Sequence, residues 1–177
     1  MSVRAALRSA TEQNHERVDA AFSQYDLSSR EGYRRFLLRQ AAAHLPVERA
    51  LDDAAGDVIE DWAIRRRADA IRADLADLGC QDIAEAPFDG FTSQAGLLGG
   101  VYVLEGSRLG GQILRKQVSE ALPTRFLAQG SSLAWRAFIA VLEAKLTSKE
   151  EIAEAIAGAR AVFACFEAAA RRDVESY

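Results

Sequence analysis

One stretch of the chain, from Gly99 to Lys116, has the apolar spacing of a single helix and yet contains several glycines. Each glycine costs roughly 0.5–1 kcal/mol relative to alanine inside a helix. Positions three and four residues apart share a helix face, and here that face is nearly bare of side chains: Gly99, Val103, Gly106, Ser107 and Gly110. Such a face indicates either a close crossing with another helix or a flat ligand that lies against the glycines.

Length and charge restrict the class of protein. The 177 residues are enough for one domain with a sizeable core, so we expect residues 1–177 to form a single domain. The net charge is −4 and the basic residues are dispersed, which does not favour a nucleic-acid partner. The densest basic run, Arg65-Arg66-Arg67, is interpreted as a solvated helix face. The sequence shows no signal peptide, no apolar run of membrane-spanning length and no paired cysteines, which predicts a cytoplasmic protein without a membrane partner.

Apolar residues recur at helical spacing along the whole chain, and no segment alternates as a strand does. The first helix is expected over residues 3–23, and a capping box, Ser28-x-x-Glu31, is expected to open the second. Pro46 should kink or interrupt that second helix. A third helix is expected to turn one apolar stripe inward and to end at Gly79 in a left-handed conformation: Ile64, Ala68, Ile71, Leu75 and Leu78.

The second half of the chain predicts three more helices. Thr92 or Ser93 can cap the glycine-containing helix, after a loop over residues 80–91. A further loop is expected up to about Gly130, after which Ser131 or Ser132 can cap the next helix. Capping boxes at Thr147 and Ser148 predict the start of the last helix. The predicted fold class is therefore all-α, a single-domain helical bundle.

His15 lies on the inward edge of the first expected helix, and Glu12-x-x-His15 matches half of a di-iron carboxylate site. The other histidine, His44, has Ala41 three residues before it, so a di-iron site lacks ligands. Zinc would also lack ligands, and neither a serine nucleophile elbow nor a phosphate loop is present.

A heme group carries four in-plane nitrogens and needs as few as one protein ligand. Heme held between the His15 helix and the glycine helix would explain both features, because Gly106 and Gly110 would let the backbone pass close to the macrocycle. Arg8 and Arg136 are available for its propionates. A buried structural role for His15 remains the alternative.

Two motifs resemble the heme oxygenase family, in its bacterial branch. Leu7-Arg8-Ser9-Ala10-Thr11, followed by His15, resembles the first helix of the family. The run from Tyr102 to Gln112 resembles its kinked distal helix, whose glycines contact heme and dioxygen. The resemblance implies an oxygen- and electron-donor-dependent enzyme that opens heme to biliverdin and releases iron and carbon monoxide. It also implies a redox donor, such as a ferredoxin or a reductase, and a biliverdin-accepting phytochrome as a further partner.

The resemblance implies a role for each of several residues: His15 as the proximal iron ligand, Gly106 and Gly110 at the distal pocket, Arg8, Tyr102 and Arg136 near the propionates, and Phe163 against the macrocycle. Animal enzymes carry an aspartate at the position of Ser107, where it anchors a water chain that delivers protons. Here the serine hydroxyl, backbone carbonyls and waters would have to do so. The neighbouring Glu105 is predicted to have a structural role. Two alternatives stay open, a heme sensor or storage protein of the same fold and a helical relative without heme.

Overall fold

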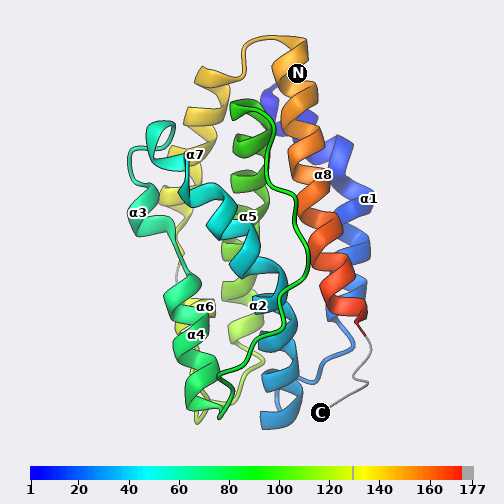
Figure 1. The fold of residues 1–177 in the computed structure, drawn as a ribbon, viewed down its shortest axis with the longest axis vertical. Coiled ribbons are helices and arrows are strands. Elements are labelled where there is room, and N and C mark those ends of the chain that lie inside the picture. The colour runs from blue at the N-terminus through cyan, green and yellow to red at the C-terminus, as the bar shows by residue number, and fades with distance from the viewer. Residues whose placement is uncertain (129, 173–177) are drawn as a thin grey trace.

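The computed structural model describes residues 1–128 and 130–172, and these residues form helices and loops without a strand (Figure 1). Gln129 and residues 173–177, which belong to the expected domain 1–177, lie outside the described residues. The prediction of an all-helical fold is confirmed. The helices in chain order are α1 (Val3–Phe22), α2 (Arg30–Asp52), η1 (Ala55–Asp57), α3 (Trp62–Arg65), α4 (Ala68–Asp77), α5 (Gln94–Arg115), α6 (Arg125–Ala128), α7 (Ser132–Lys145) and α8 (Lys149–Arg171).

The long helices form a bundle in which α8 packs along α5, α1 and α2 (Figure 1). The apolar core runs between these helices and continues under α4 and α6. Its largest fully buried side chains are Tyr33, Phe36, Phe126 and Phe138, together with leucines from α1, α2, α4, α5 and α7. No helix among the described residues is both long enough and apolar enough to cross a bilayer.

Serine side chains begin the helices where the local pattern predicted a start. Ser93, Ser131 and Ser148 accept hydrogen bonds from the first turns of α5, α7 and α8, and Ser148 forms the complete capping box with Glu151. The start of α2 differs by one residue from the prediction. Ser29 is its cap, because Ser28 instead donates its hydroxyl to Asp26 in the preceding turn.

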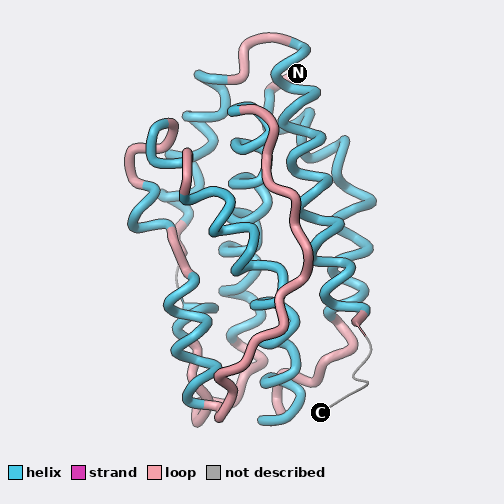
Figure 2. Tube along the Cα trace, in the orientation of Figure 1, coloured by secondary structure: helices cyan, strands magenta, loops and turns pink. Residues whose placement is uncertain are grey.

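Pro46 lies inside α2 without interrupting it, so of the two predicted outcomes, a kink or an interruption, the interruption is wrong. A proline lacks the N–H that would bond the carbonyl four residues earlier, which here belongs to Ala42. The backbone N–H of Ala86 donates to that carbonyl at 2.7 Å instead. Ala86 lies in the long loop that runs along the bundle between α4 and α5 (Figure 2). The loop therefore supplies the hydrogen bond that the proline removes.

The predicted third helix is divided into α3 and α4, and Ile64 is 78% exposed instead of lying inward. The division occurs where the Glu48 carboxylate of α2 accepts the backbone N–H groups of Arg67 and Ala68, which begins α4. Gly79 has the predicted left-handed conformation, with φ of 81°. The loop expected before Gly130 contains the short helix α6, whose first N–H groups bond the buried carboxylate of Asp74. A carboxylate from a distant helix thus caps each of these two starts.

Candidate functional site

The glycines of α5 divide into two groups with different surroundings. A Cβ atom on Gly99 would lie 2.7 Å from the carbonyl carbon of Ala155 in α8, and one on Gly158 of α8 would lie 2.6 Å from the carbonyl carbon of Gly96. The backbones of α5 and α8 cross so closely here that neither position has room for a side chain. Gly99 therefore does not belong to a free face, and the prediction that placed it there is wrong.

Gly106 and Gly110, two and three turns further along α5, face open space. Among the described residues, a Cβ on Gly110 would meet no atom within 4 Å, and one on Gly106 would meet only the Trp135 ring at 4.0 Å. No close helix crossing explains these two positions. We refer to Gly106 and Gly110 as the open glycine face. Ser107, between them, is partly buried.

His15 lies on α1 with 65% of its side chain exposed, which does not agree with the alternative of a buried histidine. Its ring stacks on Phe163 of α8 at a centroid distance of 5.8 Å and an interplanar angle of 29°. Its Nε2 atom lies 3.3 Å from the carboxylate of Asp19, which is itself exposed. Phe163 is buried beneath the imidazole. A structural histidine enclosed by the core is therefore excluded, and the imidazole is free to bind a ligand.

Cationic and aromatic side chains gather near the first turns of α1. Tyr102 of α5 is half-buried, and its ring lies 5.8 Å from that of Trp135. Burial raises the pKa of Tyr102, and the positive charges of Arg4 and Arg8 oppose this rise. The guanidinium of Arg4 also lies over the Trp135 ring at 5.8 Å. Sequence reasoning missed Arg4, although it precedes Arg8 by one helical turn.

The structure does not bring every predicted residue into this group. Arg136 is exposed, and within residues 1–128 and 130–172 it takes part in no hydrogen bond or ion pair. It follows Trp135 on α7, so its place near the site rests on sequence adjacency alone.

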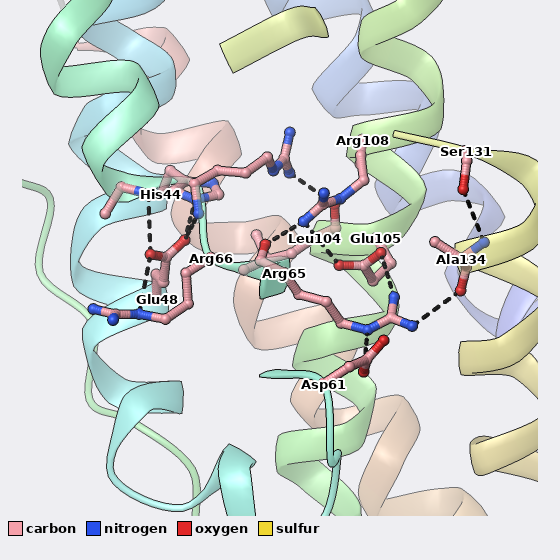
Figure 3. A network of polar contacts seen from close by, with 12 residues as sticks. His44, Glu48, Asp61, Arg65, Arg66, Leu104, Glu105, Arg108, Ser131 and Ala134 are labelled. Carbon is pink, nitrogen blue, oxygen red and sulfur yellow. Dashed lines mark hydrogen bonds and ion pairs between the residues drawn. The ribbon is translucent and has the colours of Figure 1, made fainter. Parts of the chain in front are cut away.

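A buried polar network joins α5 to α3 and the residues that follow α3 (Figure 3). Arg65 of α3 donates to Glu105 of α5 at 2.9 Å, and Arg67 donates to the carbonyl of Leu104 at 2.9 Å. Arg108 donates to the carbonyl of Arg65 and lies 3.4 Å from Glu105. Because Arg65 and Arg67 are buried, the predicted solvated face is wrong for both. The contacts of Glu105 agree with its predicted structural role.

The arginine run carried a signal that could have located this network. The first and third arginines of the run, Arg65 and Arg67, are buried, whereas Arg66 between them is exposed and pairs with Asp52. The sequence contains the charges but not the partners, since the carboxylate of Glu105 is forty residues away. Burial of an arginine requires such partners, and these are supplied by helices that only the fold brings together.

His44 and Glu48, one turn apart on α2, form a buried pair with Nε2 and Oε2 2.7 Å apart (Figure 3). Burial lowers the pKa of His44 despite its hydrogen bond to Glu48, so the imidazole is neutral and donates through Nε2–H. Burial by itself would raise the pKa of Glu48, but the bonds from His44 and from two backbone N–H groups hold it at about 2. The Nδ1 atom of His44 is buried and, within the described residues, has no hydrogen-bond partner.

Replacing Glu48 by glutamine should destabilise the protein at neutral pH by roughly 1.5–3 kcal/mol, because charge-assisted bonds to the start of α4 are lost. A carboxylate whose pKa is lowered by folding stabilises the fold at any pH above 4.5, the pKa of the unfolded state. This stabilisation is lost as the pH falls toward 2, the pKa in the folded protein. The stability difference between the parent and Glu48→Gln should therefore narrow below about pH 4.5. Denaturant unfolding across this range measures it, with the exposed Glu60→Gln as control. A difference that stays constant down to low pH would contradict the assignment.

Comparisons with known proteins identify the family of this chain. A sequence model of the heme oxygenase family matches residues 1–172. A heme oxygenase of Xanthomonas campestris is 44% identical over 112 residues, which cover 59% of this chain and 67% of the relative. The heme oxygenase PigA of Pseudomonas aeruginosa is 32% identical over 169 residues, covering 86% of this chain and 83% of the relative.

Solved structures show the same fold. The NO- and CO-bound heme oxygenase from Neisseria meningitidis superimposes with a TM-score of 0.84 at 29% sequence identity, covering 99% of this chain and 96% of that one. A heme oxygenase from Leptospira interrogans shares the fold with a TM-score of 0.73 at 18% identity, covering 96% of this chain and 98% of that one. The family match over nearly the whole chain, together with these relatives, shows that this chain belongs to the heme oxygenase family.

Proposed function

We propose that this chain binds heme between α1 and α5 and opens it to biliverdin, with release of iron and carbon monoxide and with dioxygen as co-substrate. One observation carries the proposal: among the described residues, only the edge of the Trp135 ring approaches the open glycine face of α5, in a chain whose α1 presents an exposed imidazole. Heme acts here as both substrate and cofactor.

The residues present fit a heme group. A Cβ at Gly110 would project into free space that a macrocycle can occupy, as would one at Gly106. A metal-ligating imidazole needs an orienting group, and the stacked ring of Phe163 fixes the plane of His15. The carboxylate of Asp19 lies 3.3 Å from Nε2 of His15, so this contact would have to break if Nε2 bound the iron. These contacts support His15 as the proximal ligand.

The propionates require cations and hydroxyl donors that are not already neutralised. Arg8 is exposed, and both Arg4 and Arg8 place positive charge near the phenol of Tyr102. We assign the propionates to Arg8 and Tyr102, with Arg4 and Arg136 as further cations. Attraction between guanidinium and carboxylate would then fix the rotation of heme within the site.

When bound, heme supplies a redox-active iron for dioxygen and the conjugated ring that is cleaved. The chain supplies position and protons. Ser107, beside Gly106, is the hydroxyl nearest in sequence to the open glycine face and can hold a water that passes protons inward. The backbone atoms of Gly106 and Gly110 approach the ligand closely because no side chain intervenes.

The reaction also requires electrons, and we assign their delivery to a ferredoxin or a reductase. We further propose that the protein acts in the cytoplasm as one domain over residues 1–177 and that a phytochrome accepts the biliverdin.

The direct test is to add hemin to the purified protein, record the Soret band, and then supply a reductant and air. We expect a heme complex that converts to biliverdin. A protein that binds hemin but forms no biliverdin with any reductant would instead be a heme sensor or store.

Ser107→Ala should leave hemin affinity unchanged but slow biliverdin formation by roughly 10–100-fold, the loss typical of a weakened proton-transfer contact. The loss should be partial, since backbone carbonyls can hold the same water. Ser107→Asp should retain activity, unless burial keeps the new carboxyl protonated. Single-turnover kinetics under air measure both variants. Unchanged turnover in Ser107→Ala would remove the hydroxyl from the proton route.

A further inference from the structure

We propose that Arg65 is a positioning residue: it holds the first turns of α7 against the distal helix α5 and thereby places the Trp135 indole at the edge of the open glycine face. This inference rests on the function proposed above, because it assigns one wall of the heme site. Arg65 itself touches neither Gly106 nor Gly110.

The guanidinium of Arg65 joins three helices (Figure 3). Its Nε donates to Asp61 in the turn before α3 at 2.7 Å, and its Nη1 donates to Glu105 of α5 at 2.9 Å. Its Nη2 donates to the carbonyl of Ala134 on α7 at 3.1 Å. The Arg65 side chain is only 4% exposed, and its bond to Glu105 is buried, while its bonds to Asp61 and Ala134 are partly buried. One rigid, planar group therefore sets the spacing between α5 and α7.

In α7, no residue before Phe138 is fully buried, although the Trp135 ring packs against the core. The buried residues of the helix are Phe138 and Leu142, further along, whereas Leu133 near its start is 70% exposed. Arg65 contacts α7 at two points, the Ala134 carbonyl and the Phe138 ring, which lies 5.8 Å from the guanidinium. The hydrogen bond to Ala134 therefore adds a polar anchor at the start of α7, beside the packing of the Trp135 ring.

The residue after Ala134 is Trp135, the side chain nearest to the open glycine face. Its ring lies 4.0 Å from the position of a Cβ on Gly106 and 5.8 Å from the Tyr102 ring. A shift of α7 would move the indole along the edge of the proposed heme site. Arg65 thus acts on the site through Trp135.

An arginine suits this role better than a lysine. Its planar group donates in three directions from three nitrogens at once, whereas a lysine ammonium presents one nitrogen at the end of a flexible stem. Arg65→Lys keeps the charge that Glu105 and Asp61 require. It should, however, lose the bond to Ala134, which isolates the positioning role.

The first test uses the protein without heme. Trp62 and Trp135 are the two tryptophans of the chain, so Trp62→Phe leaves Trp135 as the only indole fluorophore. In that background, Arg65→Lys should raise acrylamide quenching of Trp135 roughly twofold, because the first turns of α7 open locally. Arg66→Lys is the matched control: Arg66 is half-exposed, pairs with Asp52 and should leave quenching unchanged.

The second test measures heme. Release of hemin to excess apomyoglobin should be roughly five- to tenfold faster in Arg65→Lys, the loss expected from one buried hydrogen bond. Trp135→Leu should speed release similarly, and the double variant should be no faster than Trp135→Leu alone, because both changes act through one indole. Additive effects would overturn the proposal.

A purely structural role gives a different result. If Arg65→Lys lowers the melting temperature while Trp135 quenching and hemin release stay at parental values, the proposal is wrong. Should Arg65→Lys fail to fold, Glu105→Gln keeps the shape of the partner and weakens the ion pair, so unchanged quenching there would also overturn it. Failure of the parent protein to bind hemin would overturn the proposed function, while the quenching result would still decide whether Arg65 positions Trp135.

Discussion

Replacing His15 by alanine should remove the normal ligation of heme iron and reduce biliverdin formation by roughly 100-fold or more, because the site proposed above holds the iron through this one imidazole. The fold should be almost unaffected. The side chain is 65% exposed, and its one polar contact is with the exposed Asp19, so the free energy of unfolding should change by less than about 0.5 kcal/mol. Far-ultraviolet circular dichroism and the ferric Soret band measure the two properties separately.

Glu12→Ala is the matched control for His15→Ala. Glu12 lies one turn earlier on α1, is exposed, and belongs to the Glu-x-x-His pair that a di-iron site would use. It should leave both the spectrum and turnover unchanged. Added imidazole should restore part of the ferric spectrum of His15→Ala by entering the vacated position. An unchanged Soret band with undiminished turnover in His15→Ala would remove this residue from the proximal role.

Gly110→Leu and Gly106→Leu should weaken hemin binding by roughly 100-fold or more, because a leucine side chain would fill space that the macrocycle needs. Stability should not fall in Gly110→Leu. No atom lies within 4 Å of the position of a Cβ on Gly110, and replacing a helical glycine gains up to about 1 kcal/mol from helix propensity. Hemin titration measures the affinity for hemin, and thermal unfolding of the apoprotein measures its stability.

Gly99→Ala and Gly158→Ala should have the opposite effects. Each added methyl group would collide with backbone across the α5–α8 crossing, so the helices must separate, at a cost of about 1–3 kcal/mol. The molecules that remain folded should still bind hemin through the open glycine face. A Gly110→Leu variant that melts higher than the parent and makes biliverdin at the parental rate would show that no ligand lies against that face.

Much of the local structure is determined by short-range chemistry. A serine side chain satisfies the free N–H groups of a helix start wherever it stands, so Ser93, Ser131 and Ser148 were identifiable from sequence alone. Gly79 likewise ends α4 in a left-handed conformation that side chains disfavour. The pair of motifs around His15 and Gly106 identified the family for the same reason, since both lie within single helices.

Predictions from local sequence failed where a residue distant in the sequence forms a hydrogen bond with the helix concerned. Pro46 stays inside α2 because Ala86 bonds the carbonyl that the proline ring leaves free. The third predicted helix is divided because Glu48 caps α4 at Arg67 and Ala68. Each partner belongs to another element, so no window of sequence around the affected residue contains the cause.

The sequence by itself determined an all-helical fold with one glycine-rich helix and one candidate ligand, because helical periodicity and residue chemistry are properties of contiguous segments. The family was indicated by the resemblance of two motifs. The sequence did not determine which glycines pack and which stay open. Gly99 and Gly110 are equivalent in the helical spacing of the sequence. Only the position of α8 places Gly99 at a close helix crossing and leaves Gly110 facing open space. The burial of Arg65 and Arg67 was likewise decided by the fold, because a charge enters the interior only where distant helices supply its partners.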